Sequence, residues 1–261
     1  MFARVQLVFM GAALSALPLG CASHSAIAPD ALGLLSVQPA TGALTPADTY
    51  LVLSKEPREG TAGSGEPMVR EYDIIEGKHA GAVLVEEVRR KSPDVEAWTV
   101  TRRVKTKKEP LEEATFERRE DGGIVLTGSV NHDRGVIVEM DPRPVTIPAS
   151  LEPGAMHKQE MKMRLPLISR PSRLRDKGTG TMELTYVDDQ AVRLGGGGER
   201  ITARHTREVF TSKLGKATAV RTIDRWFAPG HGLVAERWTE EVRLFGGMPI
   251  ESSVFAIRLK P

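Results

Sequence analysis

The sequence predicts an all-β, mainly antiparallel fold in which a curved sheet forms an open half-barrel or clam, with room for one short helix. Short runs rich in Val, Ile, Thr and aromatic residues recur from Thr49 onward, separated by clusters of Gly, Pro or Asp. Strands that follow one another through short polar turns pair antiparallel, because parallel pairing needs a long crossover. The predicted strands are 49–54, 67–76, 82–91, 96–105, 123–130, 135–140, 156–165, 180–187, 201–211, 217–228, 232–244 and 250–260.

Alternation of apolar and polar side chains supports two of these strands directly. Trp98, Val100 and Val104 share one face of the strand 96–105, and Phe255 and Ile257 share one face of the strand 250–260. Because successive side chains of a strand point to opposite faces, this pattern indicates a sheet with one buried face and one face in water.

Two segments carry helical signals. Residues 110–120 begin with Pro110, with acidic residues early and basic residues late, as at the ends of a helix; we leave their structure open. Val234, Trp238 and Val242 recur every four residues, but the neighbouring segments resemble strands, so we predict a strand over 232–244.

The first 21 residues resemble an export signal. Arg4 precedes about fifteen mostly apolar residues without a charge. The segment Leu17-Pro18-Leu19-Gly20-Cys21 resembles the bacterial lipobox, in which a small residue precedes a cysteine that becomes diacylated. This resemblance implies lipid attachment at Cys21, the only cysteine, and an outer-membrane lipoprotein that faces the periplasm. Cleavage after the small residues of 26–28 is the alternative, and it would release a soluble periplasmic or secreted protein.

The expected organisation has three parts. Residues 1–21 form the signal peptide, residues 22–48 a flexible tether rich in Ser, Ala, Pro, Gly and Thr, and residues 49–261 a single antiparallel β domain. No later segment is apolar enough to span a bilayer.

Composition excludes several classes of protein. With 40% hydrophobic and 27% charged residues, the chain is neither collagenous nor wholly disordered. Lys and Arg total 36 against 34 Asp and Glu, which gives no support to nucleic-acid binding through a broad positive field. A single cysteine excludes a disulfide framework within the chain.

A turn motif near the C-terminus carries a family resemblance. Residues 224–234, from Asp224 to Val234, include Trp226-Phe227-Ala228-Pro229-Gly230-His231-Gly232-Leu233, which resembles the W-[FY]-A-x-G-x-G-L-V signature of uncharacterised bacterial envelope proteins. The resemblance covers roughly residues 145–260 and implies a LolA/LolB-like open half-barrel. The resemblance implies a fold, but it identifies no catalytic residue. We expect the aromatic residues around this turn to pack inward.

A search for catalytic and metal-binding motifs finds none. The six histidines are scattered without an H-x-x-x-H pair, and Glu86-Glu87 and Glu240-Glu241 are adjacent on strands, so each pair points to opposite faces. Residues 195–198 lack the Lys-Ser/Thr of a phosphate loop. We therefore expect no metal, no cofactor and no catalytic residue, although a Ser-His-Asp triad assembled in space is not excluded by sequence.

A cluster of basic residues over 164–177 is a candidate anion-binding patch, for lipid headgroups, acidic glycans or a protein. A solvated loop is the alternative. The patch consists of Arg164, Arg170, Arg173, Arg175 and Lys177.

These observations favour a non-catalytic, lipid-anchored envelope protein that binds an apolar ligand, a lipid or an envelope partner on its curved sheet. A structural lipoprotein of an envelope assembly is the alternative, and a cryptic hydrolase is a further one. The apolar face of a curved sheet is the expected ligand site, although the same residues would also form a packed core. Its candidate lining residues are Trp98, Val100, Trp226, Phe227, Trp238, Phe255 and Ile257.

Overall fold

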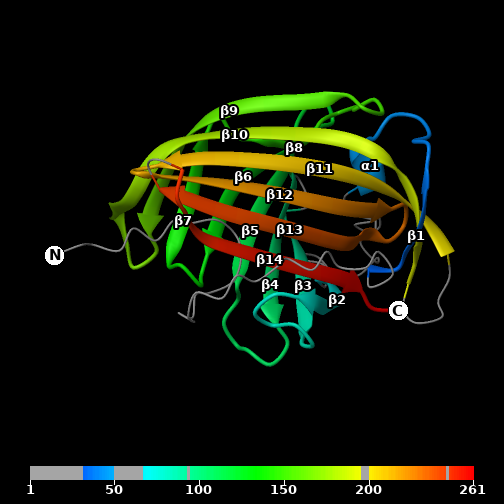
Figure 1. The fold of residues 1–261 in the computed structure, drawn as a ribbon, viewed down its shortest axis with the longest axis horizontal. Helices are drawn as coiled ribbons and strands as arrows, with labels where there is room; N and C mark the ends of the chain where they lie inside the picture. Colours follow the sequence, from blue (N-terminus) through cyan, green and yellow to red (C-terminus); the bar gives the residue numbers. More distant parts are fainter. Residues whose placement is uncertain (1–31, 50–66, 93–94, 195–199, 245–246) are drawn as a thin grey trace.

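The fold is almost entirely antiparallel β structure, as the sequence predicts (Figure 1). The computed structural model describes residues 32–49, 67–92, 95–194, 200–244 and 247–261. Cys21 and the signal peptide, most of the predicted strand 49–54 and the loop 195–198 lie outside these residues. The elements are β1 (Leu34–Gln38), α1 (Pro46–Thr49), β2 (Met68–Glu76), β3 (Val83–Ser92), β4 (Val95–Val104), β5 (Glu112–Arg118), β6 (Ile124–Asn131), β7 (Val136–Asp141), β8 (Val145–Ile147), β9 (Met156–Leu167), β10 (Arg170–Arg193), β11 (Arg200–Leu214), β12 (Ala217–Ala228), β13 (Gly232–Leu244) and β14 (Pro249–Leu259).

The sheet closes into a barrel of 12 strands, so the prediction of an open half-barrel is wrong. The ring runs β10-β11-β12-β13-β14-β2-β3-β4-β5-β6-β7-β9 and returns to β10. β9 closes it, because it pairs with β7 through Met140↔Met163 and with β10 through Gly180↔Met161. In a closed ring every strand has a neighbouring strand on both sides. The ring therefore has no edge strand, which is where open sheets associate with other chains.

Most strands fall where the sequence predicts them. The undecided segment 110–120 contains β5, and the predicted strand 232–244 is confirmed as β13. β1 and β8 were not predicted. β10 is far longer than the predicted 180–187, because its first half continues the hairpin with β9 and its last residues pair with β1.

One end of the barrel is covered by residues that precede β2. β1 lies inside the segment expected to be a tether, and α1 contacts β12 and β13. Leu44 pairs with Leu151 through two backbone hydrogen bonds, and Arg204 donates to the Ala43 carbonyl and forms an ion pair with Asp48. The barrel domain therefore includes residues N-terminal to Thr49.

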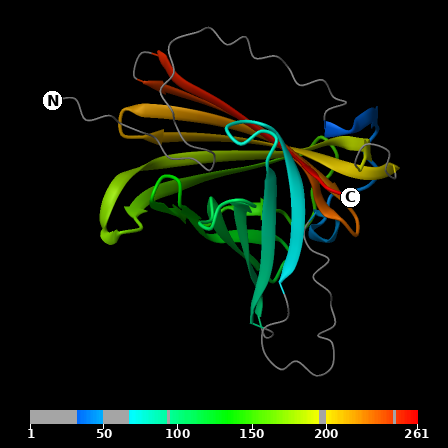
Figure 2. The ribbon, with the colours of Figure 1, turned by 90° about the horizontal axis from the view of Figure 1, so that it is seen from below.

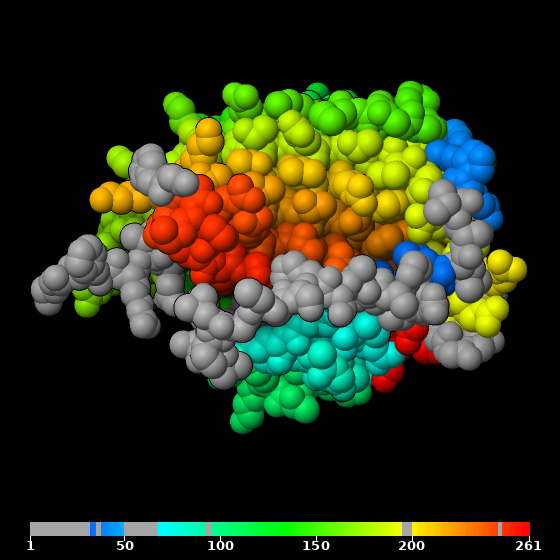
Figure 3. All heavy atoms as spheres, viewed as in Figure 1, coloured from blue at the N-terminus to red at the C-terminus, as the bar shows by residue number. Residues whose placement is uncertain are grey.

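The two groups of strands cross one another in space. Figure 2 shows β2, β3 and β4 running across the long strands β10–β14. Figure 3 shows the outer face of β10–β14 as a surface filled by side chains, from the β13–β14 turn to the end that carries β1. Apolar side chains of both groups form one large buried cluster, which includes Tyr72, Leu84, Phe227 and Trp238. Another joins β7 and β9 to β10–β13 and includes Met163, Phe210 and Leu214.

No helix among the described residues is both long and apolar enough to cross a membrane.

The close approach of β10 and β11 at Gly178 gives a test of the barrel wall. A Cβ at this position would lie 1.8 Å from the Lys213 carbonyl oxygen. We expect Gly178→Ala to lower the free energy of unfolding by about 1–3 kcal/mol, because the backbone of one strand must move. Chemical denaturation monitored by circular dichroism measures it.

Gly128→Ala in β6 is the matched control. Its nearest neighbour would be the Thr115 Cβ at 4.0 Å, so the substitution should leave stability within about 0.5 kcal/mol of wild type. Equal effects of the two substitutions would contradict the close strand approach.

Candidate ligand-binding site

A cavity of about 150 Å³ lies inside the barrel, lined by residues of β3–β8 and β10–β14. Apolar side chains form most of its wall. Aromatic rings come from opposite sides of the ring, including Phe116 on β5, Phe210 on β11 and Trp238 on β13. The further apolar lining residues include Leu84, Leu111, Ala114, Leu126, Val138, Ile147, Met182, Leu184, Ile223, Phe227 and Phe255.

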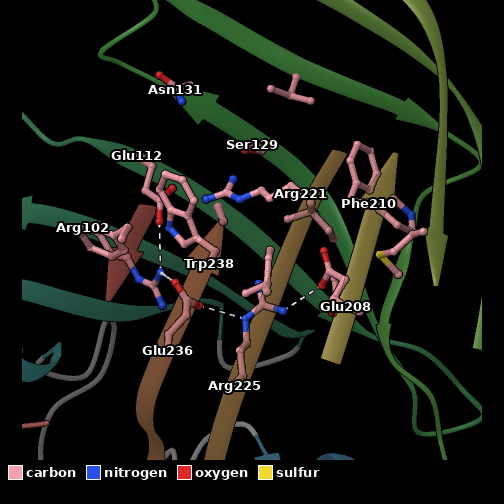
Figure 4. Close-up of a pocket in the computed structure, with 18 of the residues that line it drawn as sticks. Arg102, Glu112, Ser129, Asn131, Glu208, Phe210, Arg221, Arg225, Glu236 and Trp238 are labelled. Atoms are coloured by element: carbon pink, nitrogen blue, oxygen red, sulfur yellow. Dashed lines mark hydrogen bonds and ion pairs between the residues drawn. The ribbon is translucent and has the colours of Figure 1, made fainter. Parts of the chain in front are cut away.

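A set of buried ion pairs crosses the interior of the barrel beside this apolar wall (Figure 4). Arg102 on β4 is its centre. The Arg102 guanidinium donates from Nε to Glu86 at 2.8 Å and from Nη1 to Glu112 and Glu236, each at 3.3 Å. Burial opposes the charge of Arg102, but the three carboxylates raise its pKa well above the usual value. Arg102 therefore stays cationic inside the barrel.

The network continues from Glu236 to the neighbouring strands. Arg225 on β12 donates to Glu236 at 2.9 Å and to Glu208 on β11 at 2.8 Å. Burial would raise the pKa of Glu236, but the guanidiniums of Arg102 and Arg225 lower it to about 2. Glu236 is thus an ionised carboxylate that joins β13 to β4 and β12.

Arg221 is a further arginine in the cavity wall, four residues before Arg225 and on the same face of β12. Its guanidinium lies over the Trp238 ring, 4.1 Å from the centroid. Figure 4 shows it beside Trp238, with Ser129 and Asn131 of β6 also on the cavity wall. Ser129, Asn131 and Arg221 are all buried and line the cavity together with the ion-paired residues; we call these three residues the polar corner.

Two turns bring further polar groups to the cavity. His79 lies in the β2–β3 turn and Asp133 in the β6–β7 turn, and both line it. His79 also lies 3.4 Å from Lys107 in the β4–β5 turn. Burial and the neighbouring lysines lower the pKa of His79, so the ring is neutral at pH 7.

The structure separates the seven predicted lining residues into two groups. Phe227, Trp238 and Phe255 line the cavity. The other four are buried elsewhere: Trp98 and Val100 pack beside Phe116, Ile257 packs in the cluster of Phe255, and Trp226 lies on the outer side of β12.

The expectation that both aromatic residues before the turn pack inward is wrong for Trp226. Adjacent residues of a strand face opposite sides. Phe227 therefore enters the barrel, and Trp226 packs outside with Ala203, Val192 and Leu32. The turn itself lies between β12 and β13 as predicted, with positive φ at Gly230 and Gly232.

Outside the barrel, Trp226 belongs to a polar cluster that the sequence analysis missed. The His205 ring stacks on it with centroids 4.7 Å apart. The two ring nitrogens of His205 lie 2.9 Å from Asp188 and 2.8 Å from Asp224, so each faces a carboxylate. Neither nitrogen faces a hydroxyl that it could deprotonate, and this geometry does not suit a histidine of a Ser-His-Asp triad.

The predicted basic patch lies on the β9–β10 hairpin rather than in a loop. Arg164 and Lys177 are opposite one another in the register, and Arg170 and Arg173 are exposed beyond them. Arg164 pairs with Glu139 at 3.5 Å, and Arg175 donates to the Arg134 carbonyl. The patch is on the outer surface, apart from the cavity.

The charged residues of the interior are the part of the site that sequence reasoning missed. Arg102 lies two residues from Val100 and from Val104, so it shares their inward face of β4. Glu86 and Glu240 are the buried, inward members of the pairs Glu86-Glu87 and Glu240-Glu241. One sequence signal could have identified these residues: a charged side chain at a position where the alternation of the strand predicts an inward, apolar one.

The comparisons with known proteins return nothing: no family model, no curated protein and no solved structure matches this chain. Within the described ranges, no group of three or more His, Cys, Asp or Glu side chains is placed to hold a metal ion.

The low pKa of Glu236 predicts a pH-dependent contribution to stability. Its folded pKa of about 2 lies below the ordinary value of 4.5, so ionised Glu236 stabilises the fold above about pH 4.5, and this contribution is lost as the pH falls toward 2. We expect Glu236→Gln to cost about 3 kcal/mol at pH 7, and the difference from wild type to shrink between pH 4.5 and 2. Urea denaturation across this range measures both.

Glu241→Gln is the control on the same strand. Its carboxylate faces outward and pairs with the exposed Arg243, so we expect an effect below about 1 kcal/mol. A pH-independent cost of Glu236→Gln would contradict the assigned ionisation.

Proposed function

We propose that this protein is a non-catalytic binding protein that takes a small amphipathic molecule into the barrel. One observation carries the proposal: the cavity combines apolar and aromatic side chains with polar and charged groups that face the same space. Ligand sites in proteins have this composition, whereas the centre of a filled core does not. The polar corner of Ser129, Asn131 and Arg221 would orient the ligand, and Phe116, Phe210 and Trp238 would contact its apolar part.

The volume of the cavity restricts the class of ligand. At about 150 Å³ it is comparable to engineered apolar cavities that bind benzene, and smaller than the roughly 300–1,000 Å³ of sites for drug-sized ligands. We therefore propose a ligand with one ring or a short aliphatic chain. A complete diacyl lipid does not fit this volume, so a lipid would have to enter by one short end.

The proposed location is the bacterial envelope, with the chain attached to the outer membrane through Cys21. The apolar segment after Arg4 and the lipobox-like residues before Cys21 support it. An anchored barrel would hold its ligand in the periplasm near the membrane surface. A structural lipoprotein is the alternative, and its interior would bind no small molecule.

Filling the cavity tests the proposed function. Ala114 on β5 lines the cavity, and its neighbour Thr115 faces outward, 3.5 Å from Thr99 on the adjacent strand. We expect the full chain to bind phenylacetamide, a neutral single-ring probe, and Ala114→Leu to weaken binding about tenfold or more because the added methyl groups occupy the cavity. Isothermal titration calorimetry measures the affinity.

Thr115→Leu adds apolar volume on the other face of the same strand and should leave the affinity unchanged within about twofold. Thermal unfolding of both variants shows whether each retains the fold. An absence of phenylacetamide binding by the wild-type chain, or equal loss in the two variants, would contradict a ligand site inside the barrel.

The attachment of the chain gives an independent prediction. We expect Cys21→Ser to move the protein from the membrane fraction to the soluble fraction of bacterial cells, because the thiol that carries the lipid is absent. Cell fractionation and mass spectrometry of the N-terminal peptide measure this. A wild-type protein that begins after residue 28, and so lacks Cys21, would instead support the alternative cleavage.

A further inference from the structure

We propose that the cavity is specific for a monocarboxylate, and that the Arg221 guanidinium binds the carboxylate group. The inference rests on the proposed function, since it names the chemical class of the ligand of the same site. It follows from the different pairing of the arginines that line the cavity.

Arg102 and Arg225 are fully committed to protein carboxylates. Arg102 faces three of them and Arg225 two. Arg221 differs. In the described part of the chain no ion pair joins Arg221 to a carboxylate, and its buried Nε has no hydrogen-bond partner. With a relative exposure of 6%, this side chain is a buried cation without the pairing that such groups normally have.

The position of Arg221 leaves its donors free for a ligand. The guanidinium carbon lies over the Trp238 ring, 4.1 Å from its centroid, and this cation–π contact uses none of the N–H donors in a hydrogen bond. Its N–H groups point outward in its own plane, where they match the two oxygens of a carboxylate. The apolar part of the ligand would then lie among the aromatic rings of the same cavity.

Glu240, Glu112 and Glu236 attract the Arg221 guanidinium electrostatically, but none of them lies within ion-pair distance of it. Glu240 lies opposite Arg221 in the β12–β13 register, but its nearest cation is Arg134 at 3.6 Å, and both of its oxygens lack a hydrogen bond among the described residues. Burial raises the pKa of Glu240 and of Glu112, and neighbouring arginines, Arg221 among them, oppose this rise. Burial lowers the pKa of Arg221, and Glu240, Glu112 and Glu236 oppose this fall.

A single unpaired arginine in a small cavity fits a ligand with one negative charge. Glu236 and Glu208 are already engaged by Arg102 and Arg225, and no carboxylate of the described residues lies within ion-pair distance of Arg221. An ammonium group at this position would face Arg221 and be repelled. A carboxylate would pair with Arg221 and leave the other ion pairs intact.

Three probes with the same ring and different charge test this inference on the full wild-type chain. They are phenylacetate, phenylacetamide and 2-phenylethylamine, compared by isothermal titration calorimetry at pH 7. We expect phenylacetate to bind about 10- to 100-fold tighter than phenylacetamide, as charge-assisted hydrogen bonds imply, and 2-phenylethylamine to bind most weakly.

Arg221→Met removes the charge and keeps an unbranched apolar side chain against Trp238. We expect this substitution to remove most of the affinity for phenylacetate and to change the affinity for phenylacetamide by less than about threefold. Arg221→Lys keeps a cation and should retain the preference for phenylacetate, which gives a second test if the Met variant does not fold. Arg164→Gln, at an exposed arginine on the outer surface, is the matched control and should leave all three affinities unchanged.

The outcomes separate this inference from the proposed function. If phenylacetamide binds as tightly as phenylacetate, or if 2-phenylethylamine binds tightest, the carboxylate site is wrong although the barrel still binds a small molecule. If Arg221→Met leaves the preference for phenylacetate unchanged, the assignment to Arg221 is wrong. If none of the three probes binds, the proposed function fails together with this inference.

Discussion

The pairing of β9 with both β7 and β10 is the interaction on which the rest of the structure depends. It joins the two ends of the strand order and divides every strand into a face inside the ring and a face outside it. Inward side chains then have no access to bulk water except near the ends of the barrel. An inward arginine or glutamate must therefore find its partner inside the barrel, and the cavity exists only because the ring is closed.

The interior charges follow from this closure. Arg102, Glu236, Arg225 and Glu208 come from four different strands and connect β4 to β11, β12 and β13 across the barrel. Buried ion pairs do not generally stabilise a fold more than apolar packing would, because both ions lose their hydration. Their retention here is better explained by the cavity beside them, where they fix the strands around the polar corner and leave Arg221 as the unpaired cation.

The sequence predicts the local structure of this protein well and its closure poorly. Alternation and turn residues locate β2–β4 and β6–β7, because these signals depend on neighbouring residues. The β14–β2 pairing joins segments distant in the chain, and the β7–β9 pairing passes over β8, so no local pattern predicts either of them. The same limit applies to the site. Trp238 and Phe255 were expected on the apolar face, but Arg102 was not recognised. A charged residue between Val100 and Val104 interrupts the apolar pattern of the strand. Only the closed barrel shows that three carboxylates surround it.

The most direct test of the account is a crystal structure of the full chain grown with phenylacetamide. The account predicts a closed ring of 12 strands with the probe bound inside it, its ring among Phe116, Phe210 and Trp238. A barrel whose interior is filled by its own side chains, with the probe absent or bound only on the outer surface, would contradict the central claim that closure creates a ligand site.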